Sequence, residues 1–169
     1  MLFLPYLSPA GERAPFLDPR ARGTWWGLSL EHDRTHVARS VFEGLSLVIR
    51  DCLVAAAADV TELRVCGGGA NSDDWCQLIA DVTGVPTVRP ADTEVGAKGA
   101  FLVGMVATGA EPDLAQASER YVRVGAAREP DPTRTGAYAA RFEDFRAVRD
   151  IAAQGWARLA RTGAEQRDD

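Results

Sequence analysis

Apolar residues recur at three- and four-residue steps in two long segments of this chain, and that spacing places them on one face of a helix. The first segment starts at Thr35, an expected N-cap, and continues to about Ala58. Its apolar positions are Val37, Val41, Leu45, Val48 and Cys52. In the second segment, near the C-terminus, the apolar positions are Tyr138, Phe142, Phe145, Val148, Ala152, Trp156 and Leu159. Each segment is therefore predicted to form a long amphipathic helix.

Short apolar runs alternate with shorter helical patterns in the middle of the chain. Strands are expected at residues 23–30, 63–66 and 86–89, and helices at residues 73–83 and 94–108. The order β-α-β-α-β is typical of an α/β architecture, in which short parallel strands are flanked by helices. So few short strands cannot cover the apolar faces of all the predicted helices. The pattern therefore predicts an incomplete part of a larger fold.

The placement of proline and glycine divides the chain into three regions. Residues 1–22 are rich in proline and lack a sustained period, so they are expected to form an irregular lead segment. Residues 23–128 carry the predicted strands and form the core, and residues 129–169 hold a proline-bearing linker and the C-terminal helix. The helix at residues 94–108 is rich in glycine and alanine, so we expect another backbone to pack closely against it.

Composition narrows the classes of partner. The chain has 169 residues, a formal net charge of −5 and a pI near 5.1, so it lacks the basic surface by which proteins bind nucleic acid or an anionic membrane. Its three cysteines are odd in number and lack CxxC spacing, which favours free thiols in a reducing compartment. No apolar run approaches the length of a membrane span. We therefore expect a cytoplasmic protein with neither nucleic acid nor a membrane as partner.

The most informative motif is a run of three glycines, Gly67, Gly68 and Gly69, between a predicted strand and a predicted helix. Glycines leave the backbone N–H groups uncovered, so the main chain can lie against a flat or charged ligand. Asn71 or Ser72 can cap the helix that follows. The acidic residues at positions 73 and 74 would repel a phosphate placed on the helix axis, which favours contact with an adenosine or an off-axis phosphate. The alternative is a tight connection without a ligand.

Other candidate sites are weaker. His32 and His36 have the spacing of a metal pair, but they span a loop and a helix start, so exposed turn residues are the favoured interpretation and no metal site is predicted. Acid and base chemistry could come only from residues whose geometry nothing in the sequence fixes, namely Glu12, Arg13, Asp18 and Asp33. Lys98 lies in the small-residue helix and is predicted to be a surface group rather than a phosphate ligand. No catalytic residue is assigned.

Several of these motifs together resemble a known family. One part is Gly23-x-Trp25-x-Gly27-Leu28, then seven residues, then His36-Val37-x-x-Ser40-Val41-Phe42-Glu43. The glycine loop with Trp75, Gln77, Ala80-Asp81 and Gly84, and the run Glu94-x-Gly96-Ala97-x-Gly99-Ala100, continue the likeness. The pattern resembles the C-terminal domain of the FGGY carbohydrate kinases. The opening Leu4-Pro5-Tyr6-Leu7-Ser8 and Gly11-Glu12-Arg13-Ala14-Pro15, and the stretch 130–145, resemble xylulokinases more than glycerol kinases or gluconokinases.

This resemblance implies an actin-like ATPase fold with ribonuclease-H-like domains, of which the chain would be an incomplete second domain. It implies nucleotide contacts from the glycine loop, which carry over to Gly67, Gly68, Gly69, Ala70, Asn71 and Ser72. ATP with Mg²⁺ would be the cofactor, and a ketose such as D-xylulose the acceptor. The family's sugar pocket, catalytic aspartate and first phosphate loop would precede residue 1, so the chain alone is expected to be inactive.

The expected partners are ATP, a sugar and a first kinase domain in cis or in trans, with a homodimer as a further possibility. Two alternatives stay open. The chain could be a non-catalytic module that binds a nucleotide or a partner protein, or it could be a truncated remnant of such a kinase.

Overall fold

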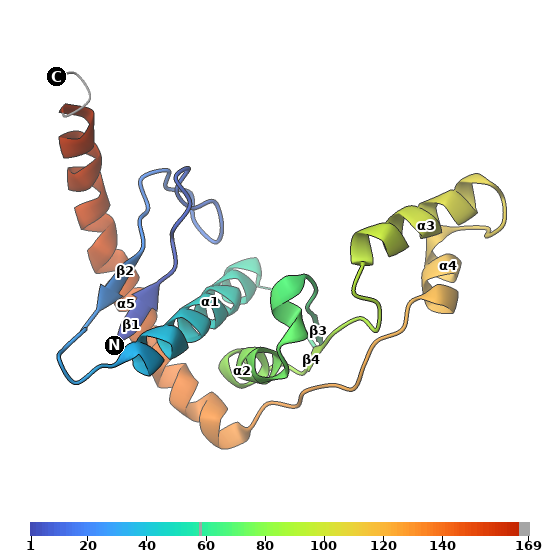
Figure 1. Cartoon of the computed structure of the whole chain (residues 1–169), viewed down its shortest axis with the longest axis horizontal. Coiled ribbons are helices and arrows are strands. Elements are labelled where there is room, and N and C mark those ends of the chain that lie inside the picture. Colours follow the sequence, from blue (N-terminus) through green and yellow to red (C-terminus); the bar gives the residue numbers. More distant parts are fainter. Residues whose placement is uncertain (58, 166–169) are drawn as a thin grey trace.

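The computed structural model describes residues 1–57 and 59–165 (Figure 1). β1 (Leu2–Leu4) pairs antiparallel with β2 (Thr24–Trp26), and Phe3 lies opposite Trp25 with the two rings stacked at 4.5 Å between centroids. The lead segment is therefore not irregular throughout, since it begins with a strand whose Phe3 and Leu4 are buried. The prediction of parallel pairing was wrong for the strand at residues 23–30, because its observed partner is the antiparallel strand β1.

The long helix α1 (Arg34–Ala56) begins two residues earlier than predicted. Its N-cap is Asp33 rather than Thr35, and the Asp33 carboxylate accepts hydrogen bonds from the backbone N–H groups of Thr35 and His36. An acidic cap is favoured here because it neutralises unpaired N–H groups at the positive end of the helix dipole. The helix ends before Ala57, which is left-handed with φ 48°. Ala58, the predicted end, lies outside the described residues.

The face that α1 buries differs from the predicted apolar stripe. The fully buried positions are Ser40, Glu43, Gly44, Ser46, Leu47 and Asp51, whereas the predicted positions are only partly buried. Backbone approach explains part of the difference, because a Cβ on Gly44 would lie 2.4 Å from the Phe3 carbonyl oxygen. Ion pairs account for Glu43 and Asp51, which face arginines of the C-terminal helix. Polar packing partners outweigh the hydrophobic period in this helix.

The centre of the chain follows the predicted pattern. β3 (Leu63–Arg64) and β4 (Thr87–Val88) are parallel neighbours, joined by the short 3₁₀ helix η1 (Gly68–Asn71) and by α2 (Asp73–Thr83). Ser72 caps α2, and Gly84 ends it with φ 73°. A later segment of the chain runs antiparallel to β4, where Thr87 and Arg128 exchange backbone hydrogen bonds of 3.1 and 2.8 Å. β2 does not join this sheet, so the described residues hold a pair of two-stranded sheets.

Two helices project from this body (Figure 1). α3 (Val95–Ala107) agrees with the prediction, whereas α4 (Leu114–Tyr121), which packs against it, was not predicted. The glycines of α3 were expected to admit a close backbone. A Cβ on Gly96, Gly99 or Gly104 would meet nothing within 4 Å, so no described segment makes that approach.

The C-terminal helix α5 (Pro132–Glu165) completes the core. Of the predicted face, Tyr138, Phe142, Phe145, Val148 and Trp156 are buried, whereas Ala152 is half-buried and Leu159 is exposed. The buried residues meet Leu4 and Tyr6 near β1, Leu47 of α1 and Val82 of α2 in one hydrophobic cluster. Residues 166–169 of the predicted C-terminal region lie outside the described residues. None of the described helices combines the length and the apolar composition that crossing a bilayer requires.

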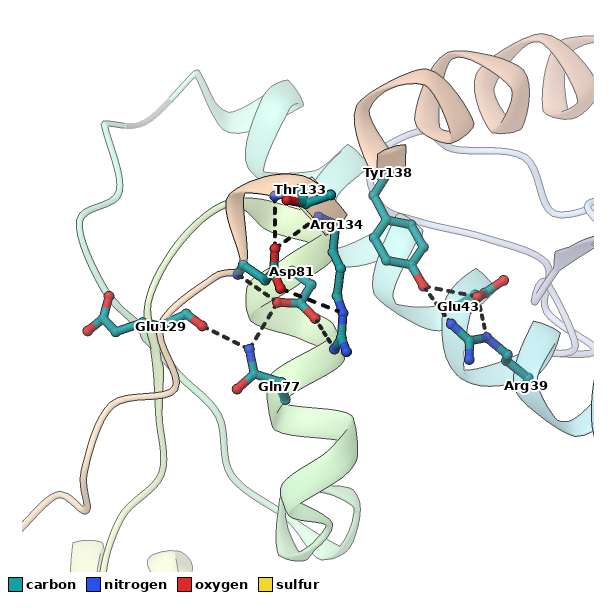
Figure 2. A network of polar contacts seen from close by, with 9 residues as sticks. Arg39, Glu43, Gln77, Asp81, Glu129, Thr133, Arg134 and Tyr138 are labelled. Carbon is teal, nitrogen blue, oxygen red and sulfur yellow. Dashed lines mark hydrogen bonds and ion pairs between the residues drawn. The ribbon is translucent and has the colours of Figure 1, made fainter. Parts of the chain in front are cut away.

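Buried carboxylates fix α5 to the helices beneath it (Figure 2). Asp81, which is 2% exposed, accepts hydrogen bonds from the Gln77 amide, the Asp131 backbone N–H and the Arg134 guanidinium, at 2.9, 2.9 and 3.2 Å. Glu43 accepts from the Tyr138 hydroxyl at 3.0 Å and from Arg39 at 2.8 Å. These contacts set the position at which the linker from α4 enters α5.

Candidate functional site at the glycine loop

The glycine loop leaves the carboxyl end of β3 and turns at once. Gly67 has φ 94°, a conformation that glycine adopts without strain and other residues avoid. A Cβ on Gly67 or Gly68 would meet nothing within 4 Å. The main chain is therefore open at these two positions, as the nucleotide-loop prediction requires.

The rest of the predicted loop has structural roles. A Cβ on Gly69 would collide with Trp75, and Ala70 is buried with its carbonyl oxygen 3.3 Å from Cys76 Sγ. The Ser72 hydroxyl accepts a hydrogen bond of 3.2 Å from the Trp75 N–H and so caps α2. The six predicted residues thus lie together, but they divide into an open part and a part that holds the loop in shape.

A groove of about 270 Å³ lies beside the loop. From the predicted set it is lined by Gly67, Ala70 and Asn71. The other lining residues are Val65, Cys66, Arg89, Pro90, Ala91, Asp92, Thr93 and Val95. The groove therefore sits at the carboxyl ends of two parallel strands, which is where open α/β sheets bind ligands.

Arg89 is the groove residue that sequence reasoning missed. It follows β4, and its guanidinium donates hydrogen bonds of 3.2 Å to the carbonyl oxygens of both Ala70 and Asn71. The same guanidinium lies 2.9 Å from the Asp73 carboxylate. Its position at the carboxyl end of the predicted strand 86–89, a parallel neighbour of β3, was the available clue, because parallel strands end at a common edge.

The charge at the start of α2 is also compensated. Asp73 lies 2.9 Å from Arg89 and 2.8 Å from Arg128, so two guanidinium groups face a single carboxylate. The predicted repulsion of a phosphate by Asp73 is therefore weakened by these neighbours. Asp74 lies on a separate cleft with Trp75, and no described basic residue pairs with it in an ion pair of this kind.

Two thiols flank the loop in contrasting environments. Cys66 is exposed and lines the groove, whereas Cys76 is buried beneath Ala70. Burial raises the pKa of the Cys76 thiol above its usual value, and the charge of Arg89 opposes part of this shift. Cys76 therefore stays protonated near neutral pH and continues to donate to the Ala70 carbonyl oxygen.

The remaining sequence candidates do not assemble into a site. His32 and His36 lie edge to face at 5.6 Å, with their Nδ1 atoms bound to Ser29 and Asp33 respectively. Asp18 pairs with Arg20, and Glu12 accepts from the backbone N–H of Arg13. Among the side chains that the structure describes, no group of three or more His, Cys, Asp or Glu residues is arranged to hold a metal ion.

Lys98 is held between two elements rather than extended into solvent. Its ammonium group lies 3.1 Å from the Asp92 carboxylate and donates a 3.1 Å hydrogen bond to the Tyr121 carbonyl oxygen. Lys98 thus links α3 to α4.

Comparison with known proteins identifies the relatives of this arrangement. The sequence profile of the FGGY family of carbohydrate kinases, C-terminal domain, matches residues 1–108. Erythritol kinase of Brucella abortus (strain 2308) is 36% identical over 162 residues, which is 95% of this chain and 31% of that protein. Xylulose kinase of Escherichia coli (strain K12) is 34% identical over 148 residues, covering 85% of this chain and 30% of that protein.

The fold is similar to solved structures in the same group. The crystal structure of ligand-bound xylulose kinase from Lactobacillus acidophilus superimposes with a TM-score of 0.83 at 27% identity, covering 94% of this chain and 32% of that one. The architecture is therefore the actin-like ATPase fold, of which the chain holds part of one domain. The chain spans about a third of the length of these relatives.

Proposed function

We propose, since the chain belongs to the FGGY family of carbohydrate kinases, that it is the ATP-binding C-terminal part of a sugar kinase. The observation that carries this proposal is the open backbone of Gly67 and Gly68 beside a groove at the carboxyl ends of β3 and β4. Gly67, Gly68 and Asn71 would contact the nucleotide directly. Gly69 and Ala70 would hold the loop in the shape that permits this contact, and Ser72 would cap the helix that follows.

The reaction would be transfer of the γ-phosphoryl group of MgATP to a sugar hydroxyl. Such transfer needs the nucleotide, the metal and the acceptor to be positioned together with a base for the hydroxyl proton. Magnesium binds phosphate oxygens and a few carboxylates, and the described residues present no carboxylate cluster for it. The metal ligands, base and sugar pocket would therefore come from a companion domain and from ATP itself. We expect no activity from this chain alone.

A ketose such as D-xylulose is the proposed acceptor. The support is the likeness of residues 4–15 to xylulokinases, together with the xylulose kinase relatives. The erythritol kinase relative makes a polyol the competing choice. Phosphorylation assays with the chain joined to a companion domain would compare D-xylulose with erythritol, and a preference for erythritol would overturn the ketose assignment.

Calorimetric titration with MgATP tests the nucleotide site. Gly68→Val should abolish binding, because the added side chain would enter open space where the ligand is proposed to lie. Gly136→Val is the matched control, since Gly136 is equally open but lies in α5, away from the loop. Circular dichroism should show unchanged helix content in both variants. Equal affinity in the wild type and Gly68→Val would refute the proposed role of the loop.

The alternative is a non-catalytic module that binds a nucleotide or a partner protein. The observation that favours it is α3, which is apolar around its circumference yet leaves Phe101 and Val103 47% and 57% exposed. Such a helix is normally buried. Light scattering discriminates, because a stable monomer that ignores an added companion domain would count against docking, while a homodimer would show that the chain associates with a second copy. A chain without a cooperative melting transition would instead be a remnant.

A further inference from the structure

Arg89 connects the strand, the loop and the helix that surround the groove. Its side chain reaches from the end of β4 to two successive carbonyl oxygens of the loop, those of Ala70 and Asn71, and to the carboxylate of Asp73. The Arg89 guanidinium therefore contacts both the loop and the start of α2, and Arg89 also lines the groove. Arginine suits this arrangement because its planar fork presents several donors in fixed directions.

The backbone of Arg89 is itself held on both sides. The Arg89 carbonyl oxygen accepts a 2.9 Å hydrogen bond from the Gly125 N–H, and the preceding residue Val88 accepts one of 2.9 Å from the Val65 N–H. The side chain therefore starts from a fixed point, and its contacts transmit that position to the loop. A loop of glycines needs such an anchor because glycine restricts its own conformation least.

The contacts also determine which charges a ligand meets. Carbonyl oxygens and a carboxylate repel phosphate oxygens, and the Arg89 guanidinium pairs with both kinds of group at once. Arg128 adds a second positive charge at Asp73 but does not share the recorded contacts with the loop. Arg89 therefore acts on both the shape of the loop and the charge of Asp73, whereas Arg128 acts on that charge alone.

We propose that Arg89 is a positioning residue for the nucleotide, which fixes the conformation of the glycine loop and, with Arg128, cancels the negative charge of Asp73 beside the phosphates. This inference rests on the proposed nucleotide site. It assigns Arg89 a role in discriminating ATP from uncharged nucleosides, since only a ligand with phosphates responds to the charge of Asp73.

Two measurements on the full chain test the inference. Hydrogen exchange of the amides at residues 68–72, measured without any nucleotide, reports how firmly the loop conformation is held. Arg89→Ala should raise their exchange at least about tenfold, while Arg128→Ala leaves it unchanged and Arg89→Lys gives an intermediate value. Unchanged exchange in Arg89→Ala would overturn the loop role whether or not the chain binds nucleotide.

The affinities for ATP and for adenosine test whether Arg89 cancels the negative charge of Asp73. In Arg89→Ala the affinity for ATP should fall at least about tenfold more than the affinity for adenosine, and adding Asp73→Asn should restore the wild-type ratio without restoring slow loop exchange. Equal losses for the two ligands would overturn the charge role, because a merely structural effect weakens both alike. A wild-type chain that binds neither ligand would contradict the proposed function and the charge role, and the exchange result would still decide the loop role.

Discussion

The indole of Trp75 lies where a side chain on Gly69 would have to be. A Cβ at Gly69 would fall 2.0 Å from Trp75 Cζ3, which is far inside van der Waals contact. The indole is held there by a 3.2 Å hydrogen bond from its Nε1 to Ser46 Oγ of α1 and by edge-to-face contact with Phe42. The third glycine of the loop therefore serves packing between the loop and α1.

Gly69→Ala should displace Trp75 and destabilise the fold. We expect a loss of about 1–3 kcal/mol in the free energy of unfolding, as overpacking of a tight site usually causes. Denaturant melts would measure the loss, and the ¹H–¹⁵N signal of the Trp75 indole should shift as its bond to Ser46 breaks. Gly68→Ala is the control and should change neither, because a Cβ there meets nothing within 4 Å. An unshifted indole signal in Gly69→Ala would contradict the packing role.

Ser72→Ala should lower stability without weakening nucleotide binding. The Ser72 hydroxyl caps α2, and loss of such a cap costs about 1 kcal/mol. Ser72→Thr keeps an acceptor and should retain most of that stability. Calorimetric titration with ATP should give affinities within about twofold for all three proteins. If Ser72→Ala lost affinity at unchanged stability, the hydroxyl would be a ligand contact rather than a cap.

Asp81→Asn should loosen the start of α5. The carboxylate receives three donors in a nearly solvent-free position, and an amide would turn its own donor toward some of them. The expected loss is about 2 kcal/mol, which thermal and denaturant melts would measure. Asp144→Asn makes the same chemical change at an exposed position of α5 and should cost far less. Equal, small effects would show that the network of Figure 2 contributes little.

Alkaline conditions should destabilise the chain through two buried phenols. Burial raises the pKa of Tyr6, and to a lesser extent that of Tyr138, so the folded state holds these protons more tightly than the unfolded chain. The stabilisation is complete below the ordinary tyrosine pKa of about 10 and is lost as pH rises above it. Melting temperatures measured between pH 8 and about pH 11 should therefore fall at the alkaline end.

Tyr6→Phe should reduce that alkaline loss and keep or raise stability at pH 7. The buried Tyr6 hydroxyl has no hydrogen-bond partner among the described residues, so its removal forfeits no recorded contact. The ring keeps its edge-to-face contacts with Phe16 and Trp156. A variant that melted well below the wild type at pH 7 would show that the hydroxyl does stabilise the fold.

Local patterns predicted those parts of the fold that depend on local chemistry. The parallel pairing of β3 and β4, the Ser72 cap and the Gly84 end of α2 follow from apolar runs, capping residues and glycine conformations within a few positions. β1 escaped prediction because its partner β2 is about twenty residues away in sequence and the intervening prolines mask any period. The buried face of α1 was missed because Glu43 and Asp51 are buried against side chains of α5, which are far away in the sequence.

The position and openness of the glycine loop were predictable from the sequence, but the separate roles of its residues were not. Three glycines after a strand predict an open loop, and two of them are open. Whether a given glycine faces a ligand or a neighbouring ring depends on where Trp75 packs, and that follows from α1. Arg89 needed the parallel register of β3 and β4, because its contacts join residues 18 and 19 positions apart.

Alkylation of Cys66 in the presence and absence of MgATP tests the central claim most directly. Cys66 is exposed and lines the groove, and buried Cys76 in the same chain reports whether the fold remains intact. With iodoacetamide and peptide mass spectrometry, Cys66 should react quickly in the free chain and at least about fivefold more slowly at saturating MgATP, while Cys76 reacts slowly in both. An unchanged Cys66 rate at saturating MgATP, with Cys76 still protected, would contradict a nucleotide site at the glycine loop.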